Sequence, residues 1–176
     1  DWLIISCNTA QRVGDLFKFN KSNLNDKGDV LTVQQTKNAN SKPIQIPLLS
    51  QVLEILKKYN GDFPPLLSDN IRNNYKYYNE LIKDVCKKAD LDDDVKTLQY
   101  KSNDNDSDYT NKKKWELVSS HIGRRSFATN YYTKMPTALI TSITGHKTES
   151  SFLLYIDRER SIDLDDLRSQ MMNAMK

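Results

Sequence analysis

Two short stretches in the second half of the chain carry residue types that act on phosphates. Both histidines fall there: His121 in the run His-Ile-Gly-Arg124-Arg, and His146 in Thr-Gly-His. Tyr155 follows nine residues after His146, and Arg12 near the N-terminus can supply a second guanidinium. Guanidiniums that grip phosphate oxygens, imidazoles that move protons and a phenol that can attack form a metal-free set for phosphodiester chemistry.

The spacing of His121 and Arg124 predicts an anion site at the start of a helix. Residues three apart share a helix face, and Ser119 or Ser120 can cap a helix that begins just after them. Free backbone N–H groups and the positive end of the helix dipole would add to the charge of Arg124. The alternative is that Arg124 and Arg125 are solvated surface charges and that His121 is packed.

Each of the other candidates also has a plainer explanation when taken alone. His146 follows a glycine, as a residue at the C-terminal cap of a helix does. Tyr155 is one of nine tyrosines, most of which serve packing. Arg12 and Asp15, three residues apart on a predicted helix, can form a surface ion pair worth a few tenths of a kcal/mol. Lys37 stands in a polar loop, where an exposed lysine is ordinary.

Mostly helical elements must bring these groups together. Apolar spacing and end signals predict helices over 1–7, 9–18, 70–89, 120–132 and 148–157, one beginning near Ser50, and one from Pro136 to just before Gly145. Alternation predicts strands over 30–36, 43–46, 95–100 and 114–118, with polar hairpin segments at 37–41 and 102–108. An apolar stripe within 162–175 predicts a last amphipathic helix. We expect an α+β domain, mainly α-helical, with a small antiparallel β-sheet.

Composition sets broad limits. The 176 residues fit one domain, and 38% hydrophobic residues can fill a core. A net charge of +3 permits a nucleic-acid partner without requiring one. Cys7 and Cys86, far apart in the sequence, indicate two reduced thiols, and no apolar run suits a membrane span. The chain opens on Asp-Trp-Leu-Ile-Ile, typical of a buried helix, so we expect a fragment whose upstream part is missing.

Taken in order, these residues resemble the catalytic domain of tyrosine recombinases, the integrases of phages and conjugative transposons. The resemblance runs from Cys7 to Tyr155, and its most specific stretches are 120–129 and 143–148. It departs from the usual pattern beside the functional side chains. Ala10 and Gln11 stand where Gly-Leu is common, Gly123 and Arg125 where Leu and His are common, and Thr144 where Leu is usual.

The resemblance implies DNA strand exchange through a 3′-phosphotyrosyl link made by Tyr155. Arg12 and Arg124 would bind the non-bridging phosphate oxygens, where charge builds in the transition state. His121 would accept or share the phenol proton, and His146 would hydrogen-bond the phosphate or orient the tyrosine.

Two further residues receive roles by the same resemblance. Lys37 would protonate the leaving 5′-oxygen, although Lys42 also lies near the predicted turn. Asp15 would hold Arg12 in place without reacting. No cofactor and no metal are implied.

The resemblance also implies context. Residues 1–176 would be a C-terminal catalytic domain without its upstream start and without an N-terminal DNA-binding domain. The partners would be double-stranded DNA at recombination sites, further copies of the protein in a tetramer, and an accessory DNA-bending protein, with no membrane. The location would be the bacterial cytoplasm. The alternatives are DNA relaxation like that of type IB topoisomerases, and a DNA-binding module without catalysis. A metal-dependent nuclease is disfavoured because the acidic runs read as loops.

Overall fold

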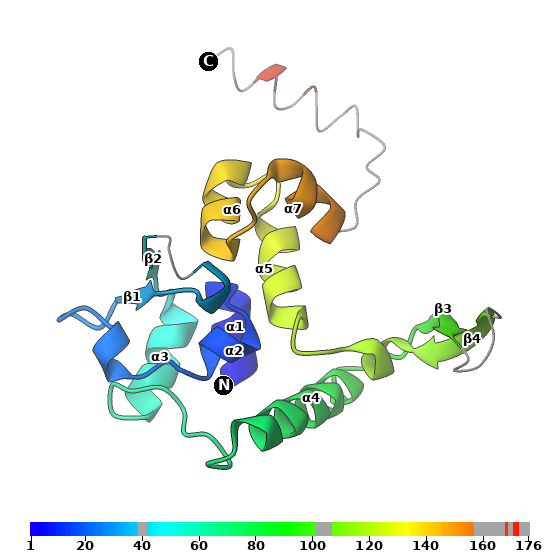
Figure 1. The fold of residues 1–176 in the computed structure, drawn as a ribbon, viewed down its shortest axis with the longest axis horizontal. Helices are drawn as coiled ribbons and strands as arrows, with labels where there is room; N and C mark the ends of the chain where they lie inside the picture. The colour runs from blue at the N-terminus through cyan, green and yellow to red at the C-terminus, as the bar shows by residue number, and fades with distance from the viewer. Residues whose placement is uncertain (39–41, 101–106, 157–167, 169–170, 173–176) are drawn as a thin grey trace.

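Helices dominate the molecule, and the strands form two separate two-stranded antiparallel sheets (Figure 1). The computed structural model describes residues 1–38, 42–100, 107–156, 168 and 171–172. The helices are α1 (Trp2–Thr9), α2 (Val13–Leu16), α3 (Ser50–Lys58), α4 (Ile71–Lys88), α5 (Ile122–Tyr131), α6 (Thr137–Thr144) and α7 (Glu149–Tyr155). The strands are β1 (Val30–Val33), β2 (Ile44–Pro47), β3 (Asp94–Tyr100) and β4 (Ser107–Lys113). The mainly helical α+β prediction is confirmed, with two small sheets where one was expected.

The main hydrophobic core joins α1 to the first sheet, α3 and α4. We call it the large cluster, and its buried members are Ile5, Leu16, Phe17, Phe19, Leu31, Val33, Ile46, Leu48, Val52, Ile55, Leu56, Phe63, Tyr78 and Ile82. Burying each large apolar side chain contributes roughly 1.5–3 kcal/mol before entropy is counted. The large cluster therefore fixes the N-terminal half of the chain, including the turn between α1 and α2.

A second core lies where α5, α6 and α7 meet. This small cluster consists of Ala10, Phe127, Ala128, Ile140, Phe152 and Ile156. Helix α6 ends at Gly145, whose positive φ of 67° suits a glycine and whose N–H bonds to the carbonyl of Thr141. That end was predicted, whereas Pro136 precedes the helix as its N-cap and is not the first helical residue.

The first sheet pairs β1 with β2 antiparallel, in a register that sets Val30 opposite Pro47 and Val33 opposite Ile44. The strand was predicted to reach residue 36, but it ends at Val33. A 3₁₀ turn over Thr36–Asn38 follows, so Lys37 lies on that turn and not at the end of a strand. The turn forms because Asp15 accepts hydrogen bonds from both the N–H and the hydroxyl of Thr36.

The β3–β4 hairpin projects from the rest of the molecule beyond the C-terminal end of α4 (Figure 1). In the hairpin, Asp94 pairs with Lys113 and Tyr100 with Ser107. The predicted strand over 114–118 is wrong, because a 3₁₀ turn covers Lys114–Leu117. The N–H groups of Lys114 and Trp115 donate to backbone carbonyls in the segment just before β3. The β3–β4 pairing therefore ends at Asp94 and Lys113. Of the predicted tip over 102–108, positions 101–106 lie outside the described residues, as does most of the predicted helix over 162–175.

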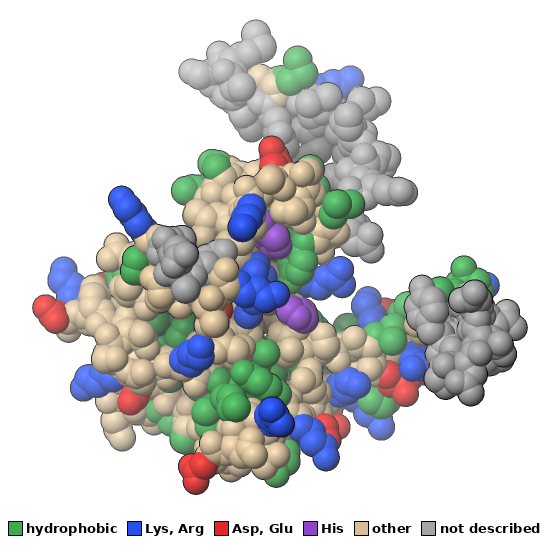
Figure 2. All heavy atoms as spheres, viewed as in Figure 1, with side chains coloured by type: hydrophobic (Ala, Val, Ile, Leu, Met, Phe, Trp, Pro, Cys, Tyr) green, Lys and Arg blue, Asp and Glu red, His purple; other side chains and the backbone are tan. Residues whose placement is uncertain are grey.

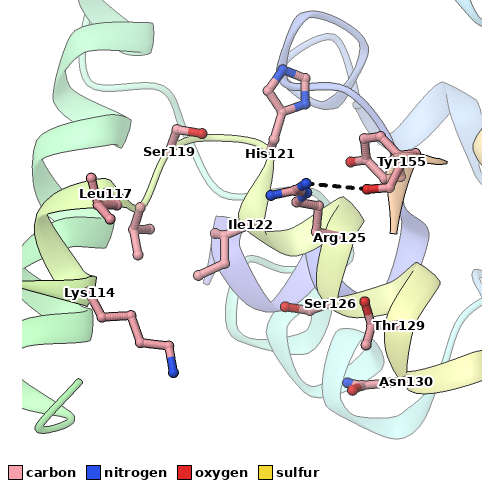
Figure 3. Close-up of a pocket in the computed structure, with 11 residues that line it drawn as sticks. Lys114, Leu117, Ser119, His121, Ile122, Arg125, Ser126, Thr129, Asn130 and Tyr155 are labelled. Atoms are coloured by element: carbon pink, nitrogen blue, oxygen red, sulfur yellow. Dashed lines mark hydrogen bonds between the residues drawn. The ribbon is translucent and has the colours of Figure 1, made fainter. Parts of the chain in front are cut away.

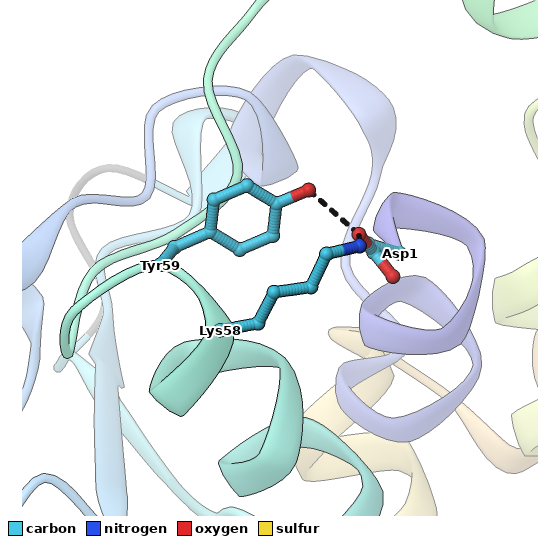
Figure 4. A network of polar contacts seen from close by, with 3 residues as sticks. All are labelled: Asp1, Lys58 and Tyr59. Carbon is cyan, nitrogen blue, oxygen red and sulfur yellow. Dashed lines mark hydrogen bonds and ion pairs between the residues drawn. The ribbon is translucent and has the colours of Figure 1, made fainter.

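The first residue of the chain is tied to the end of α3 and to the residue after it (Figure 4). The Asp1 carboxylate oxygen Oδ2 accepts a hydrogen bond from Lys58 Nζ at 2.7 Å and one from Tyr59 Oη at 2.7 Å. An exposed ion pair contributes little by itself. The Asp1 carboxylate therefore adds only a local contact at the start of α1. The position of α1 is set mainly by the large cluster. In the described part of the chain, no helix is long and apolar enough to cross a lipid bilayer.

Candidate active site

Arg12 lies in the short non-helical turn between α1 and α2. Ala10 adopts a left-handed conformation with φ of 56° and ends α1. Arg12 is then extended, with φ of −67° and ψ of 147°, and precedes α2 as its N-cap. The predicted helix over 9–18 is therefore too long. Nη1 of Arg12 is buried and has no hydrogen-bond partner among the described residues. Such a buried donor is costly unless something accepts its proton.

Arg124 is the most deeply buried charge of the site, with 2% of its surface exposed. Its Nη1 donates to the carbonyl of Ala10 at 2.9 Å, and its Nη2 donates to the carbonyl of Thr144. One guanidinium thus joins the end of α1 to the end of α6. Burial, and after it the nearby charge of Arg12, lower the pKa of Arg124 to about 10. The group stays protonated at neutral pH, and the two guanidiniums share one region of the molecule.

Gly123 allows α5 to lie directly on α1. A Cβ at this position would meet Ser6 Cβ at 2.6 Å and the backbone nitrogen of Cys7 at 3.0 Å. A leucine, common here in the resembling domains, would not fit without moving one helix. Because Gly123 directly precedes Arg124, this close approach brings the guanidinium within reach of the Ala10 carbonyl. The departure at Gly123 is therefore a packing adaptation.

His121 stands at the entrance of the site as the N-cap residue of α5. It is exposed, and no side-chain hydrogen bond caps the helix, so the predicted serine cap at position 119 or 120 is wrong. Desolvation lowers the pKa of His121. Four cations lower it further, in the order Arg124, Arg12, Arg125 and Lys37. The imidazole is therefore neutral at neutral pH, and Lys37 is near enough to act on it.

His146 lies just after α6, two residues beyond Thr144, whose carbonyl accepts a hydrogen bond from Arg124. Its Nδ1 is 2.8 Å from Thr144 Oγ1, and its ring centroid is 4.8 Å from that of Tyr155. Desolvation, together with the charges of Arg124 and Arg12, lowers the pKa of His146 to about 4. His146 is therefore also neutral at neutral pH and packed against the phenol ring.

Tyr155 ends α7 with its ring beside two guanidiniums. The Cζ atoms of Arg124 and Arg125 each lie 5.7 Å from its centroid. Arg125 Nη2 also donates to the backbone carbonyl of Tyr155 at 3.3 Å (Figure 3). The phenol oxygen is buried beside the Arg124 guanidinium, at a geometry short of a full hydrogen bond. Burial raises the pKa of Tyr155, while the charges of Arg124, Arg125 and Arg12 act to lower it.

Two predicted residues hold different positions from those expected. Asp15 is buried but directs its carboxylate to Thr36, and in the described part of the chain no ion pair joins it to Arg12. It therefore fixes the turn that carries Lys37. Lys37 itself is exposed, as is Lys42, so neither lysine is buried among the other candidates.

The sequence did not single out a buried amide network behind the site. Gln35 Nε2 donates to Gln11 Oε1 at 2.9 Å and to the carbonyl of Ile143 at 3.0 Å. Gln11 Nε2 donates to the same carbonyl at 3.0 Å. This network ties the turn before Arg12, the end of β1 and the end of α6 together. The only sequence signal was Gln11, noted as a departure from the usual pattern.

A pocket of about 640 Å³ opens beside Tyr155, between α5 and the 3₁₀ turn that precedes it (Figure 3). Its lining includes His121, Arg125, Tyr155 and Lys114. On the same face, lysine and arginine side chains gather near the histidine side chains (Figure 2). Within the described residues, no group of three or more His, Cys, Asp or Glu side chains could hold a metal ion.

The domain is mainly helical and brings two arginines, two histidines and a tyrosine together. Side chains of these types suit the binding and cleavage of a phosphodiester. The chain belongs to the phage integrase family, whose model matches residues 2–161. No curated protein matches the chain.

Solved structures show the same fold. The chain is 18% identical to XerA recombinase, covering 98% of this chain and 55% of that one, with a TM-score of 0.60. It is 16% identical to the Tn1549 transposon integrase in complex with transposon right end DNA, covering 99% and 58%, with a TM-score of 0.60. It is 21% identical to lambda integrase, seen as a dimer bound to a COC′ core site, covering 92% and 53%, with a TM-score of 0.54. The chain thus spans little more than half the length of these structures.

Proposed function

We propose that this chain is the catalytic domain of a site-specific DNA recombinase, or integrase, that cuts and rejoins DNA strands through a 3′-phosphotyrosyl intermediate. One observation supports this most strongly. The charges of Arg12 and Arg124 act on the half-buried Tyr155, and Nη1 of Arg12 is buried without a hydrogen-bond partner among the described residues. A phosphodiester between them would give the free guanidinium nitrogen an acceptor and place phosphorus beside the phenol.

The two arginines would divide the work on the phosphate. Arg124 already donates to two backbone carbonyls, so its position is fixed before DNA arrives. Arg12 has a buried nitrogen free to bind a non-bridging oxygen. Charge grows on these oxygens as the phenol attacks, and fixed donors there lower the barrier. Loss of one such donor typically costs about 10²–10³ in rate.

Protons must move twice in the cleavage step. The phenol loses its proton as the oxygen–phosphorus bond forms, and a neutral imidazole can receive it. The leaving 5′-oxygen gains a proton, and Lys37 is the proposed donor because its charge acts on His121 across the site. Attack by a 5′-hydroxyl from another strand reverses both transfers. The phosphotyrosyl link conserves the bond energy, so the step needs no metal and no high-energy cofactor.

Double-stranded DNA is the proposed partner, because the similar integrases include proteins solved with transposon end DNA and with a core site. Phosphate contacts make such binding strongly salt-dependent. Self-association into a tetramer on DNA and an accessory DNA-bending protein are part of the same proposal. We also propose that residues 1–176 form a catalytic domain that works with further parts of a longer protein.

The test is formation of a covalent adduct with nicked suicide duplexes that carry candidate attachment sites, detected by mass. The wild-type chain should form the adduct in the presence of EDTA. Tyr155→Phe should abolish it while leaving DNA affinity unchanged. Tyr109→Phe is the matched control, since Tyr109 is exposed on the hairpin. An adduct that persists in Tyr155→Phe, or that requires a divalent metal, would overturn the proposal.

A further inference from the structure

Two consecutive arginines of α5 bind carbonyl groups at the C-terminal ends of three helices. Arg124 donates to the carbonyl of Ala10, the C-cap residue of α1, and to that of Thr144, the last residue of α6. Arg125 donates through Nη2 to the carbonyl of Tyr155, the last residue of α7, at 3.3 Å (Figure 3). Carbonyls at this end of a helix have no partner within the helix and carry its negative partial charge. A guanidinium suits them both as a donor and as a cation.

Helix α7 depends on contacts with its neighbours because it is short. Its seven residues, Glu149–Tyr155, are well below the roughly 12–15 under which an isolated helix is marginal in water. Its first turn is capped by Thr148, whose Oγ1 accepts a hydrogen bond from the N–H of Ser151 at 3.2 Å. Phe152 packs its middle into the small cluster. Arg125 supplies a contact at its other end, at the residue that carries the phenol.

The guanidinium of Arg125 also faces the ring of Tyr155. Arg125 Cζ lies 5.7 Å from the ring centroid, within the roughly 6 Å at which an aromatic face attracts a cation. Arg125 is exposed and lines the pocket beside Tyr155. Arg124, in contrast, is buried, and both of its terminal nitrogens already donate to the ends of α1 and α6. Arg125 therefore contacts both the backbone and the ring of Tyr155 from the pocket side.

We propose that Arg125 is a positioning residue that holds the last residue of α7 against α5, so that the phenol of Tyr155 already lies inside the site when DNA binds. The effect on cleavage rests on the proposed function. Without the guanidinium, the end of α7 detaches in a larger fraction of the molecules, and only the remaining fraction can attack a phosphate. Arg125 itself neither reacts nor binds the scissile phosphate. Its loss should therefore lower the rate of cleavage more than the affinity for DNA.

The contact can be tested on the whole chain without DNA, by residue-resolved amide hydrogen exchange. Arg125→Gln removes the charge and the guanidinium fork from an exposed position. The N–H of Ile156 bonds to the carbonyl of Phe152 in the last turn of α7. It should exchange about tenfold faster in this variant, the effect of losing one hydrogen bond to a charged group. The N–H of Ala89, at the corresponding end of α4, should exchange as in the wild-type protein. Unchanged exchange at Ile156 would overturn the proposal.

Two further variants separate the contact from a general effect of charge. Arg125→Lys keeps a cation that can donate a hydrogen bond but lacks the planar fork, so exchange at Ile156 should lie between those of the wild-type protein and Arg125→Gln. Lys134→Gln is the charge control, because Lys134 is exposed beyond the opposite end of α5. It should leave exchange at Ile156 unchanged. Equal acceleration in Lys134→Gln and Arg125→Gln would show that net charge, and not the contact, is responsible, and the proposal would be wrong.

Single-turnover cleavage of nicked suicide duplexes, with DNA varied to saturation, then tests the effect on the nucleophile. At saturating DNA, Arg125→Gln should cleave about two- to tenfold more slowly, tenfold being the limit when the detached form predominates. Arg125→Lys should recover part of this rate. The Kd for DNA should change no more in Arg125→Gln than in Lys134→Gln. A larger loss of affinity with an unchanged saturated rate would refute the proposal, because Arg125 would then bind DNA and not position Tyr155.

The two measurements also distinguish this inference from the proposed function. Absence of any adduct from the wild-type protein would refute the proposed function, while exchange at Ile156 would still decide whether Arg125 holds the end of α7. An adduct from the wild-type protein, with faster exchange in Arg125→Gln but an unchanged cleavage rate, would refute the positioning role and leave the proposed function standing.

Discussion

The large cluster and the small cluster hold the two halves of the candidate site under different constraints. The α1–α2 turn with Arg12 rests on the large cluster, where Ile5 and Leu16 are fully buried. Helix α7 with Tyr155 has only seven residues and belongs to the small cluster, through Phe152 within it and Ile156 just after it. Regions with few buried apolar contacts open at lower free-energy cost. The half with Arg12 therefore rests on more buried apolar surface than the half with Tyr155, and we expect the Tyr155 half to open at the lower free-energy cost.

Arg124 connects the two halves, so its replacement should have the largest effect. Arg124→Lys keeps the charge but cannot donate to the carbonyls of Ala10 and Thr144 in the same forked geometry. We expect cleavage to fall by about 10²–10³, the cost of losing a transition-state donor. An unsatisfied carbonyl should also reduce the free energy of unfolding by about 1–3 kcal/mol. Suicide-substrate kinetics and urea unfolding measure both quantities.

The control for this variant is Arg72→Lys, on the exposed start of α4. It should match the wild-type protein in both measurements. If Arg124→Lys cleaved at the wild-type rate, the connecting role of Arg124 between the halves would be wrong.

Core truncations test the difference between the clusters directly. Phe152→Ala removes a fully buried ring from the small cluster, where such a change costs about 3–5 kcal/mol. We expect amide hydrogen exchange to rise over 137–156 while α1 and α3, which belong to the large cluster, keep their protection. Ile5→Ala, in the large cluster, should cost about 2–5 kcal/mol and raise exchange across the whole domain. Equal, global effects of both variants would show that the clusters unfold as one unit.

The sequence predicted the helical elements well because they rest on local patterns. The stripe over 70–89 produced α4, and Gly145 marked the end of α6. The strand predicted over 114–118 failed because the N–H groups of Lys114 and Trp115 bond to the segment before β3 and a 3₁₀ turn follows. Those bonds form only when the β3–β4 hairpin brings residues 91–93 and 114–115 together. A pattern within a few neighbouring residues cannot predict that contact.

The candidate site divides in the same way. Residue types and spacing identified the charged groups of the candidate site. They did not predict the backbone conformations that position those groups. An alanine does not predict a left-handed conformation, yet Ala10 adopts one, which ends α1 and leaves Arg12 in an extended conformation. The amide network of Gln11 and Gln35 also depends on a contact with Ile143, more than a hundred residues along the chain. Such long-range polar contacts follow from the fold and not from any sequence motif.

A moderate effect is expected at the contact between α1 and α5. Gly123→Ala would place a methyl group against Ser6 and Cys7. Overpacking of this kind costs about 1–3 kcal/mol, and it would shift Arg124 relative to Ala10. Urea unfolding should show the loss of stability, and cleavage should slow with it. Ser6→Gly removes the opposing side chain and should restore both in the double variant. No rescue by Ser6→Gly would place the strain elsewhere.

The smallest effect is a dependence of stability on pH that belongs to the small cluster. The folded-state pKa of His146 is about 4, below the ordinary 6.5, so between these values the unfolded chain binds a proton that the folded chain does not. Unfolding free energy should therefore fall as pH decreases through this window, and the loss should be complete below about 4. The comparison of His146→Gln with the wild-type protein isolates this contribution from the carboxylates that titrate nearby. His146→Gln should flatten the profile, and exchange over 137–156 should rise first as the wild-type protein is acidified. A profile unchanged by His146→Gln would mean that the imidazole is not desolvated beside the arginines, and that the nucleophile half is less closely packed than its contacts indicate.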